Sequence, residues 1–404
     1  MTNGSHQAID AAKEHFGKIV DEQLQRLIAV RKPVEWLDYS KMDRVVVGVA
    51  GGDGIGPIIS RETVRVLQNL IRDEMASGRI ELKEIAGLTI ENRIAQMKAV
   101  PDEVMEELKT CHVLLKGPTT TPEMGSGMPN LESANVAIRK AFDLFANVRP
   151  VRVPSRGIDW TFFRENTEGE YIMGSSGLMV TPDMAMDFKV TTKPGSERII
   201  RLAFDYARRT GKNKVTVVTK ANVIKTTDGL FLQTAKEVAK DFPEVGWDGW
   251  YIDVFTAKLI DEKRRRDFKV VVLPNLYGDI VTDEAAEFQG GVGTAGSANI
   301  GRRYAMFEAI HGSAPRMVQE GRGAYADPSS LMRAAAMLLE HVGMVEKAAK
   351  LNKALDVCCQ YEAKLKVTGR PDGATASDFA DYIITVMNDL QLERKWLTSQ
   401  PHAP

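Results

Sequence analysis

Two carboxylates lie four residues apart directly after an apolar run. The segment extends from Asn275 to Asp283, and its acids are Asp279 and Asp283. If a helix begins here, both side chains lie on one face about one turn apart, where they repel each other unless a cation lies between them. Carboxylate oxygens suit a hard ion such as Mg²⁺ or Mn²⁺. Taken alone, the pair fits two solvated acids of a helix better than a metal site.

A glycine-rich segment and a second polar segment follow this acidic pair. Residues 289–301 contain many glycines and no hydrophobic period, so the backbone there is able to approach a ligand or another chain closely. Residues 307–315 then place an acid, a histidine and a hydroxyl close together, as Glu308, His311 and Ser313. These residue types are able to bind a polar ligand.

The strands that must position these groups are four apolar runs, each of which ends in a polar turn. The runs are residues 44–50, 113–115, 215–218 and 270–273. Ligands of open α/β sheets bind at the carboxyl ends of strands, so the pattern predicts an α/β protein with one cleft that collects four loops. The glycines of residues 51–56 do not form the G-x-G-x-x-G pattern of a dinucleotide-binding turn.

Helical periodicity marks several further segments. We expect helices at 7–31, 57–72, 331–351 and 376–390, an arm or hairpin at 172–195, and a polar tail at 391–404. Ser133 is placed to cap a helix that carries Arg139. The basic run of residues 263–266 is interpreted as a solvated helix face.

Arg139, Arg149 and Arg164 lie between apolar or aromatic residues. A single arginine on a helix is usually solvated, and that interpretation stays open for each of them. Three guanidinium groups together, however, are suited to bind a polycarboxylate through paired hydrogen bonds.

Composition limits the class of protein. The chain has 404 residues, is 44% hydrophobic and carries a net charge of −1, which predicts two or more domains and disfavours a nucleic-acid binder. Three cysteines do not make a disulfide framework, so a reducing compartment is expected. No apolar run is long enough for a membrane helix and no signal peptide is evident, so we expect a cytoplasmic protein.

The ordered motifs of the chain resemble those of the β-decarboxylating dehydrogenases, the isocitrate/isopropylmalate family. The resemblance covers roughly residues 44–390 and is carried by Tyr171 and the following segments: 52–56, 116–122, 133–139, 149–150, 164–168, 220–222, 275–283, 290–301 and 308–315. It implies a large α/β domain built from both chain ends (1–144 and 290–404), not a Rossmann fold. A smaller α/β domain (145–289) is inserted between them, with a clasp at 172–195 that interlocks a homodimer.

The resemblance also implies the substrate. Isocitrate dehydrogenases resemble Ser-x-Asn-x-x-x-Arg at the helix that carries Ser133, Asn135 and Arg139 here. Isocitrate is therefore the expected substrate, and homoisocitrate or 3-isopropylmalate is the alternative. A catalytically silent regulatory subunit is a further alternative, but such a chain would lack a metal acid, an arginine or the lysine.

Site residues carried over by resemblance complete the expectation. The metal, Mg²⁺ or Mn²⁺, is expected on Asp279, Asp283 and Asp253 of the partner subunit. Lys220, also contributed across the dimer, is expected to remove the hydroxyl proton, and Tyr171 to return a proton to the enolate carbon. Without the resemblance, Lys220 is interpreted as a solvated lysine and Tyr171 as a packing residue.

The nicotinamide cofactor is expected to contact residues of both chain halves. They are Lys116, Thr119, Thr121, Asn222, Glu308, His311, Gly312, Ser313, Ala314, Arg316 and Asp327. Arg316 stands where many NAD-using members resemble Asp, and it either binds a 2′-phosphate or points to solvent. Asp327 slightly favours NAD. The expected cofactor is NADP or NAD, with Arg316 favouring NADP, and no nucleic acid or membrane partner is expected.

Overall fold

The structure is a computed structural model that describes residues 3–32, 34–122, 127–173, 176–291 and 294–399. The chain divides into two compact units. Unit 1 comprises Met1–Glu35 and Trp160–Val281, and unit 2 comprises Trp36–Asp159 and Thr282–Pro404. The predicted domain boundaries at 144/145 and 289/290 stay a prediction. Residues 1–35 group with unit 1, whereas the prediction placed them in the large domain with residues 36–144.

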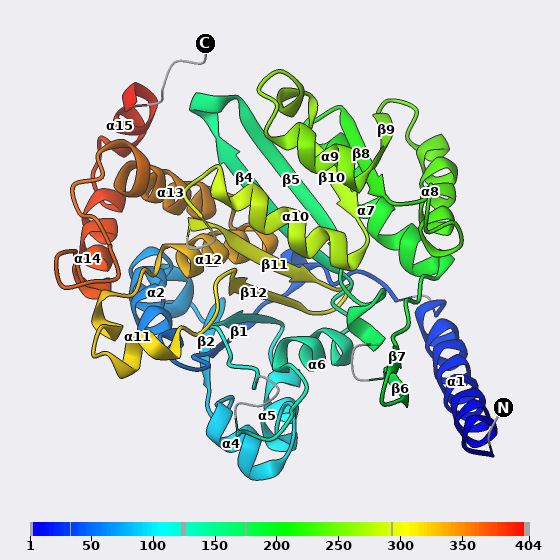
Figure 1. Ribbon diagram of the computed structural model, residues 1–404. Coiled ribbons are helices and arrows are strands. Elements are labelled where there is room, and N and C mark those ends of the chain that lie inside the picture. The colour runs from blue at the N-terminus through cyan, green and yellow to red at the C-terminus, as the bar shows by residue number, and fades with distance from the viewer. Residues whose placement is uncertain (1–2, 33, 123–126, 174–175, 292–293, 400–404) are drawn as a thin grey trace. The chain divides into compact units, whose positions relative to one another are not determined.

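Unit 1 contains four parallel strands in the order β5-β10-β8-β9 (Figure 1). The strands are β5 (Ile158–Glu165), β8 (Lys214–Thr219), β9 (Gly246–Tyr251) and β10 (Val270–Leu273), and the helices are α7 (Lys193–Thr210), α8 (Thr227–Val238) and α9 (Ile252–Leu259). α7 packs on β8 and β10, whose residues are almost all buried. A parallel sheet buried on both faces explains why its strands read as continuous apolar runs.

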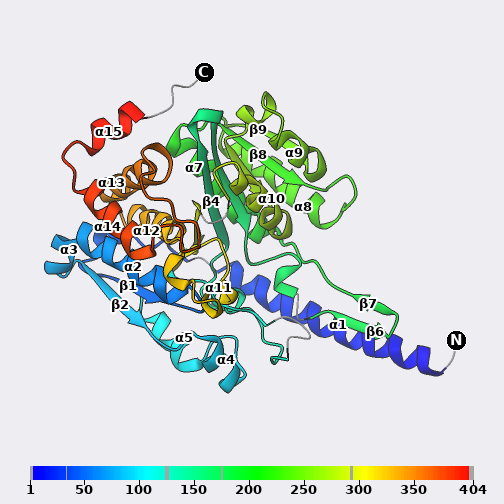
Figure 2. The ribbon, with the colours of Figure 1, turned by 60° about the vertical axis from the view of Figure 1, so that its left-hand side comes forward.

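The N-terminal helix of unit 1 lies beside a two-stranded hairpin (Figure 2). The helix is α1 (Asn3–Val30), and the antiparallel hairpin is formed by β6 (Leu178–Thr181) and β7 (Met184–Met186). The hairpin lies within the arm predicted at 172–195, of which residues 174–175 lie outside the described residues. α1 confirms the helix predicted at 7–31.

Unit 2 contains six strands in the order β2-β1-β3-β12-β11-β4. They are β1 (Val45–Ala50), β2 (Ile80–Ile85), β3 (Val113–Lys116), β4 (Ala146–Val153), β11 (Gly296–Ile300) and β12 (Ala305–Ala309). The first four in spatial order are parallel, whereas β11 runs antiparallel to both of its neighbours. Residues 292–293 of the predicted glycine-rich segment lie outside the described residues.

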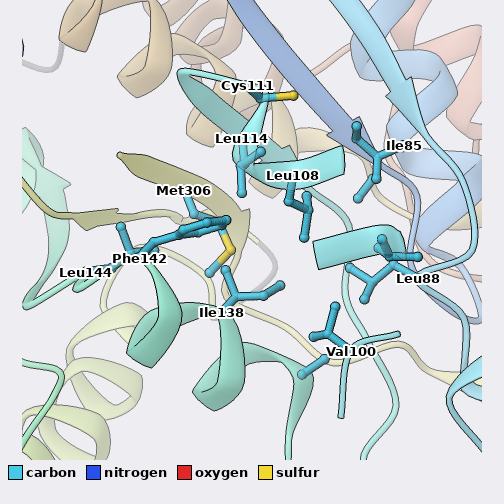
Figure 3. Packing of buried hydrophobic residues seen from close by; sticks show 13 residues of the cluster. Ile85, Leu88, Val100, Leu108, Cys111, Leu114, Ile138, Phe142, Leu144 and Met306 are labelled. Carbon is cyan, nitrogen blue, oxygen red and sulfur yellow. The ribbon is translucent and has the colours of Figure 1, made fainter. Parts of the chain in front are cut away.

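Helices cover this sheet and bury an apolar core. They are α2 (Gly56–Leu70), α3 (Arg72–Ala76), α4 (Ile90–Gln96), α5 (Asp102–Lys109), α6 (Ala134–Ala141), α11 (Pro315–Gln319), α12 (Ser329–His341), α13 (Val345–Asp356), α14 (Ala376–Met387) and α15 (Leu392–Ser399). Figure 3 shows one core cluster, in which Ile138 and Phe142 at α6 meet Leu108 of α5 and Met306 of β12. The cluster fixes α6, which carries the predicted substrate residues.

The predicted α/β class is confirmed, and so are the four predicted strands. Two local predictions are wrong. Residues 392–399 form α15 instead of a polar tail, because Leu392 is buried and Trp396 Nε1 donates to Asp356 at 2.9 Å. Residues 400–404 of that tail lie outside the described residues. The basic run at 263–266 is not fully solvated, because Arg265 is 7% exposed and its carbonyl accepts from Trp160. Within the described residues, no helix is both long and apolar enough to span a membrane.

Candidate active site

The helix after β10 carries the acidic pair. α10 (Asn275–Glu287) begins in unit 1 and ends in unit 2, and it places Asp279 and Asp283 on successive turns. Within unit 1, Arg164 from the end of β5 donates to Asp279 and, through Nε, to Asn275 Oδ1 at 2.9 Å. Tyr171 donates its hydroxyl to the other oxygen of Asp279 at 2.5 Å. Three of the predicted site residues therefore meet.

Lys220 and Asp253 form a second pair in unit 1. They follow the neighbouring strands β8 and β9, and Lys220 Nζ lies 2.7 Å from Asp253 Oδ1. The lysine side chain is 24% exposed and that of the acid 60%. The hydrogen bond from Lys220 is the main reason that the pKa of Asp253 lies below its usual range. Lys220 is therefore not simply a solvated lysine.

A buried cluster in unit 2 surrounds Glu308 of β12. Arg139 of α6 donates to its carboxylate at 2.9 Å, Asn299 of β11 donates at 2.8 Å, and Lys116 of β3 lies 3.5 Å away. Burial alone would raise the pKa of Glu308, but Lys116 and Arg139 together lower it to about 2. Burial also lowers the pKa of Lys116. Glu308 thus orients two of the predicted site cations.

The start of α6 holds the other predicted substrate residues. Ser133 is the N-cap residue of α6, as predicted, although its side chain makes no capping hydrogen bond. Asn135 Oδ1 accepts from the Thr119 hydroxyl at 3.4 Å. A carboxylate is suited to this helix start, because unpaired backbone amides and the helix dipole favour negative charge there.

Arg149 lies on β4 and is 6% exposed. It donates to the Thr282 hydroxyl at 2.6 Å and to Asp283 at 2.9 Å. With Arg164 at 2% exposed, neither is a solvated arginine. Arg139, whose side chain is 11% exposed, is mostly buried as well. Each of the three guanidinium groups forms an ion pair with an acid.

Three loops of unit 2 converge where the cofactor was predicted. Asp53 accepts from the backbone amides of Ile90 and Thr120, both at 2.7 Å, and the hydroxyls of Thr120 and Ser313 lie 2.7 Å apart. A Cβ on Gly54 would lie 2.0 Å from the Ser313 carbonyl oxygen, and the φ of Gly54 is +59°. Glycine is therefore required where the loops of residues 51–56 and 311–315 meet.

The remaining predicted cofactor residues differ in their surroundings. His311 Nδ1 lies 2.9 Å from the Gly312 carbonyl, and its Nε2 is buried with no hydrogen-bond partner among the described residues. Asp327 accepts from the Ser329 amide at 2.8 Å, and burial raises its pKa. Ala314 has a left-handed backbone with φ of 44°. The buried imidazole nitrogen fits a ligand hydroxyl, as a nicotinamide dinucleotide offers.

Other predicted cofactor residues are exposed. Thr121 and Gly312 are exposed in unit 2, and Asn222 is exposed in the turn after β8 of unit 1. The Arg316 side chain is 87% exposed, and its Nε donates to Glu320 at 2.7 Å. Arg322 donates to the same carboxylate at 2.6 Å. Two guanidinium groups thus converge on one acid next to the 311–315 loop.

The carboxylates fit a hard cation only in part within one chain. Asp279 and Asp283 offer oxygen donors, and their side chains are 30% and 57% exposed. Among the residues that the structure describes, no three acidic or metal-binding side chains gather in one place. The donor set therefore matches Mg²⁺ or Mn²⁺ if further oxygens come from the substrate and from a second copy of the chain.

Sequence reasoning missed the amides and hydroxyls that hold the charged groups. Asn275 orients Arg164, Thr282 orients Arg149, and Asn299 orients Glu308. Asn299 and Asn147 are buried in β11 and β4, and Asn147 Nδ2 donates to Asn299 Oδ1 at 2.9 Å. A polar amide inside a buried strand is nearly always hydrogen-bonded, so this pattern contained a usable indication.

Comparisons with known proteins identify the family of the chain. The family model for isocitrate/isopropylmalate dehydrogenase matches residues 46–381. An "Isocitrate dehydrogenase [NADP]" of Rickettsia prowazekii is 38% identical over 76% of this chain and 62% of its own length. An "Isocitrate dehydrogenase [NAD] subunit 2, mitochondrial" of Schizosaccharomyces pombe is 37% identical over 76% of this chain and 79% of its own.

Solved structures give the same family. The isocitrate dehydrogenase of Methylococcus capsulatus has a TM-score of 0.73 with 33% identity, covering 85% of this chain and 100% of its own. The TT0538 protein of Thermus thermophilus has a TM-score of 0.77 with 30% identity, covering 92% of this chain and 75% of its own. Since the family model spans most of the sequence and several relatives exceed 30% identity, the chain belongs to the isocitrate/isopropylmalate dehydrogenase family.

Proposed function

We propose that the chain is an isocitrate dehydrogenase. It oxidises isocitrate with NAD(P)⁺ in the presence of a divalent cation, and releases 2-oxoglutarate, CO₂ and NAD(P)H. The observation that carries the proposal is the set of isocitrate residues at the start of α6, where Arg139 is held by Glu308 at 2.9 Å. Relatives named isocitrate dehydrogenase in both NADP and NAD forms support it.

Each site residue has a defined task in this proposal. Arg139, Arg149 and Arg164 bind the substrate carboxylates, and the hydroxyl of Ser133 and the amide of Asn135 bind the carboxylate that isocitrate has and isopropylmalate lacks. Lys220 takes the proton from the substrate hydroxyl as hydride leaves for the nicotinamide. Tyr171, whose hydroxyl lies on Asp279, returns a proton to the carbon that loses CO₂.

A bound Mg²⁺ or Mn²⁺ supplies positive charge at the substrate oxygens on which negative charge develops. Asp279 and Asp283 would hold it, together with Asp253 of the partner subunit. Arg164 and Arg149, which contact these two acids, would bind the substrate carboxylates next to the cation. Because the chain carries all of these residues, two copies of it would supply a complete site.

A homodimer with shared clefts is the proposed assembly. The hairpin β6–β7 exposes Met179, Met184 and Met186, which supports a protein contact there. Lys220 and Asp253 would then move together into the neighbouring cleft, because they are bonded to each other. The Schizosaccharomyces pombe relative is named as a subunit, which would also fit an assembly of different chains. Light scattering of the purified chain therefore tests whether this chain forms a dimer by itself.

We propose the cytoplasm as the place of action. Cys111, Cys358 and Cys359 are all free thiols, and burial raises the pKa of each of them. Thiols without disulfide partners are typical of a reducing compartment.

The function is tested with the purified chain, Mg²⁺ and three substrates. Isocitrate, homoisocitrate and 3-isopropylmalate are each assayed with NADP⁺ and with NAD⁺, and NAD(P)H is followed by absorbance. We expect the highest kcat/KM with isocitrate and loss of turnover in excess EDTA. A higher kcat/KM with 3-isopropylmalate would contradict the substrate assignment.

Ser133→Asp is expected to abolish isocitrate turnover. The new carboxylate would lie where a substrate carboxylate binds, and two unit charges about 4 Å apart repel by several kcal/mol near a protein surface. Ser133→Ala is the matched comparison, since it removes the hydroxyl without adding charge, and it should lower kcat/KM for isocitrate by only about tenfold, the loss of one hydrogen bond to a charged group. A kcat/KM equal to that of the wild type in both variants would place Ser133 outside the substrate site.

Arg316 is proposed to bind the 2′-phosphate, which makes NADP the favoured cofactor. Arg316→Gln is expected to raise the KM for NADP⁺ roughly tenfold and to leave the KM for NAD⁺ unchanged. The variant loses a charge-assisted hydrogen bond to the 2′-phosphate, which NADP⁺ carries and NAD⁺ lacks. Arg394→Gln, an exposed arginine of α15, is the matched control. An unchanged KM for NADP⁺ would assign Arg316 to solvent.

A further inference from the structure

The N-terminal helix inserts one charged side chain into the interior of unit 1. α1 lies outside the segment that the family model matches, residues 46–381. Most of its charged residues are exposed, but the Arg26 side chain is only 19% exposed. Arg26 Nη1 donates to Glu168 Oε1 at 3.1 Å, and the Glu168 side chain is 4% exposed. An ion pair this buried fixes the position of both partners.

Glu168 is held from several sides. Oε1 accepts from the Thr192 hydroxyl at 2.5 Å, and Oε2 accepts from the Thr192 amide at 2.8 Å. A Cβ on Gly195 would lie 2.1 Å from Oε1, so the carboxylate packs directly against the first turn of α7. The carboxylate has no room to move without displacing α1 or α7.

The backbone of Glu168 leads directly to the substrate arginine. Its carbonyl accepts from Asn275 Nδ2 at 2.8 Å, and Asn275 Oδ1 accepts from Arg164 Nε at 2.9 Å. Asn275 is 2% exposed, and a Cβ on the neighbouring Gly278 would lie 2.6 Å from the Arg164 side chain. The side-chain amide of Asn275 therefore orients the guanidinium group of Arg164, and the carbonyl of Glu168 orients that amide.

A second buried acid makes the charge of Arg26 important. Glu165 accepts from the Thr167 amide at 3.0 Å and from the Glu168 amide at 2.6 Å. Burial and, after it, the nearby Glu168 raise the pKa of Glu165 to about 7. Without Arg26, Glu168 would lose a positive partner while this second carboxyl stays beside it, and buried charges without partners force the surrounding structure to rearrange.

We propose that Arg26 is a positioning residue for the substrate, acting through Glu168 and Asn275 on Arg164. The inference rests on the proposed function, because it assumes that Arg164 binds a substrate carboxylate. It gives α1 a task in the catalytic cycle: the helix keeps the guanidinium of Arg164 in the orientation that receives the substrate.

The test compares Arg26→Met with Arg31→Met, an exposed arginine next to α1. Arg26→Met is expected to raise the KM for isocitrate roughly tenfold, the low end of what loss of a supporting residue costs at such sites, with the KM for the nucleotide unchanged. Arg31→Met should behave as wild type. Arg26→Lys, which keeps the charge, should recover most of the affinity.

A double-mutant cycle distinguishes positioning from general stability. In an Arg164→Lys background, Arg26→Met should change the KM less than twofold, because the orientation that Arg26 maintains is already lost. Additive effects would overturn the proposal, and so would a KM equal to that of Arg31→Met. If Arg26→Met does not fold, Arg26→Gln replaces it, and failure of both to fold would make Arg26 a structural requirement instead.

The outcome is separable from that of the proposed function. The series is run on whichever of isocitrate, homoisocitrate or 3-isopropylmalate the wild type oxidises, since all three carry a carboxylate beside the hydroxyl. Turnover of another acid would overturn the isocitrate assignment while still testing Arg26. Absence of turnover with all three would overturn both proposals.

Discussion

Replacing Asp279 with asparagine is expected to lower kcat for isocitrate by roughly a hundred- to a thousandfold, the usual loss when one group that stabilises developing charge is removed. Asparagine keeps the shape of the side chain but removes its charge. In the structure, Asp279 receives hydrogen bonds from Arg164 and Tyr171, and it lies one helical turn before Asp283. Its charge is the feature that a divalent cation requires.

Two readouts separate the metal role from the pairing with Arg164. If Asp279 binds the cation, the Mg²⁺ concentration for half-maximal activity should rise in Asp279→Asn and excess Mg²⁺ should restore part of kcat. If Asp279 only orients Arg164, the KM for isocitrate should rise with the Mg²⁺ dependence unchanged. Turnover of the wild type in excess EDTA would contradict both the metal and the role of Asp279.

Glu287→Gln is the matched control for this variant. Glu287 is exposed two turns after Asp279 on the same helix, so the substitution removes the same charge from α10 at a different position. We expect near-normal kcat and Mg²⁺ dependence. A loss equal to that of Asp279→Asn would show that the overall charge of the helix matters, and not a specific carboxylate.

The hydrophobic pattern predicted most of the fold because each apolar run can be recognised from neighbouring residues alone. The runs at 44–50, 113–115, 215–218 and 270–273 became β1, β3, β8 and β10, since strands buried on both faces must be apolar along their whole length. The pattern did not predict α15, because the stability of that helix depends on partners that are distant in the sequence. The hydrogen bond from Trp396 to Asp356 spans 40 residues, and no local pattern reveals it.

The site shows the same division between local and distant information. The acids of α10 were predictable because a four-residue spacing defines a helix face. The burial of Arg149 and Arg164 was not, because a lone arginine reads as solvated until its partners are known. Asn275 and Thr282, which hold those arginines, lay inside the recognised motif without any sign of their partners on β5 and β4.

Mixing Lys220→Met chains with Asp279→Asn chains is expected to restore activity that neither variant has alone. If Lys220 serves the cleft of the partner subunit, a mixed dimer has one cleft with both defects and one cleft with neither. Random exchange of equal amounts makes half of the dimers mixed, so recovery should approach about a quarter of wild type in a two-fold symmetric dimer. The chains must be unfolded and refolded together, because an interlocked clasp exchanges slowly.

The bond between Lys220 and Asp253 supplies a matched negative control. Lys220 Nζ lies 2.7 Å from Asp253 Oδ1 in one chain, so both side chains should enter the same neighbouring cleft. Mixing Lys220→Met with Asp253→Asn chains then leaves every cleft with one defect, and no recovery is expected. Mixing Asp253→Asn with Asp279→Asn chains should behave like the first pair and approach the same recovery.

The three mixtures together locate each residue. Recovery in the two mixtures that contain Asp279→Asn, and in no other, requires that Lys220 and Asp253 cross the dimer together while Asp279 stays in its own cleft. Verified mixed dimers without recovery in any mixture would place all three residues in the cleft of one subunit. Because Lys220 and Asp253 contact each other in one chain, that result would require both side chains to reach α10 of their own subunit.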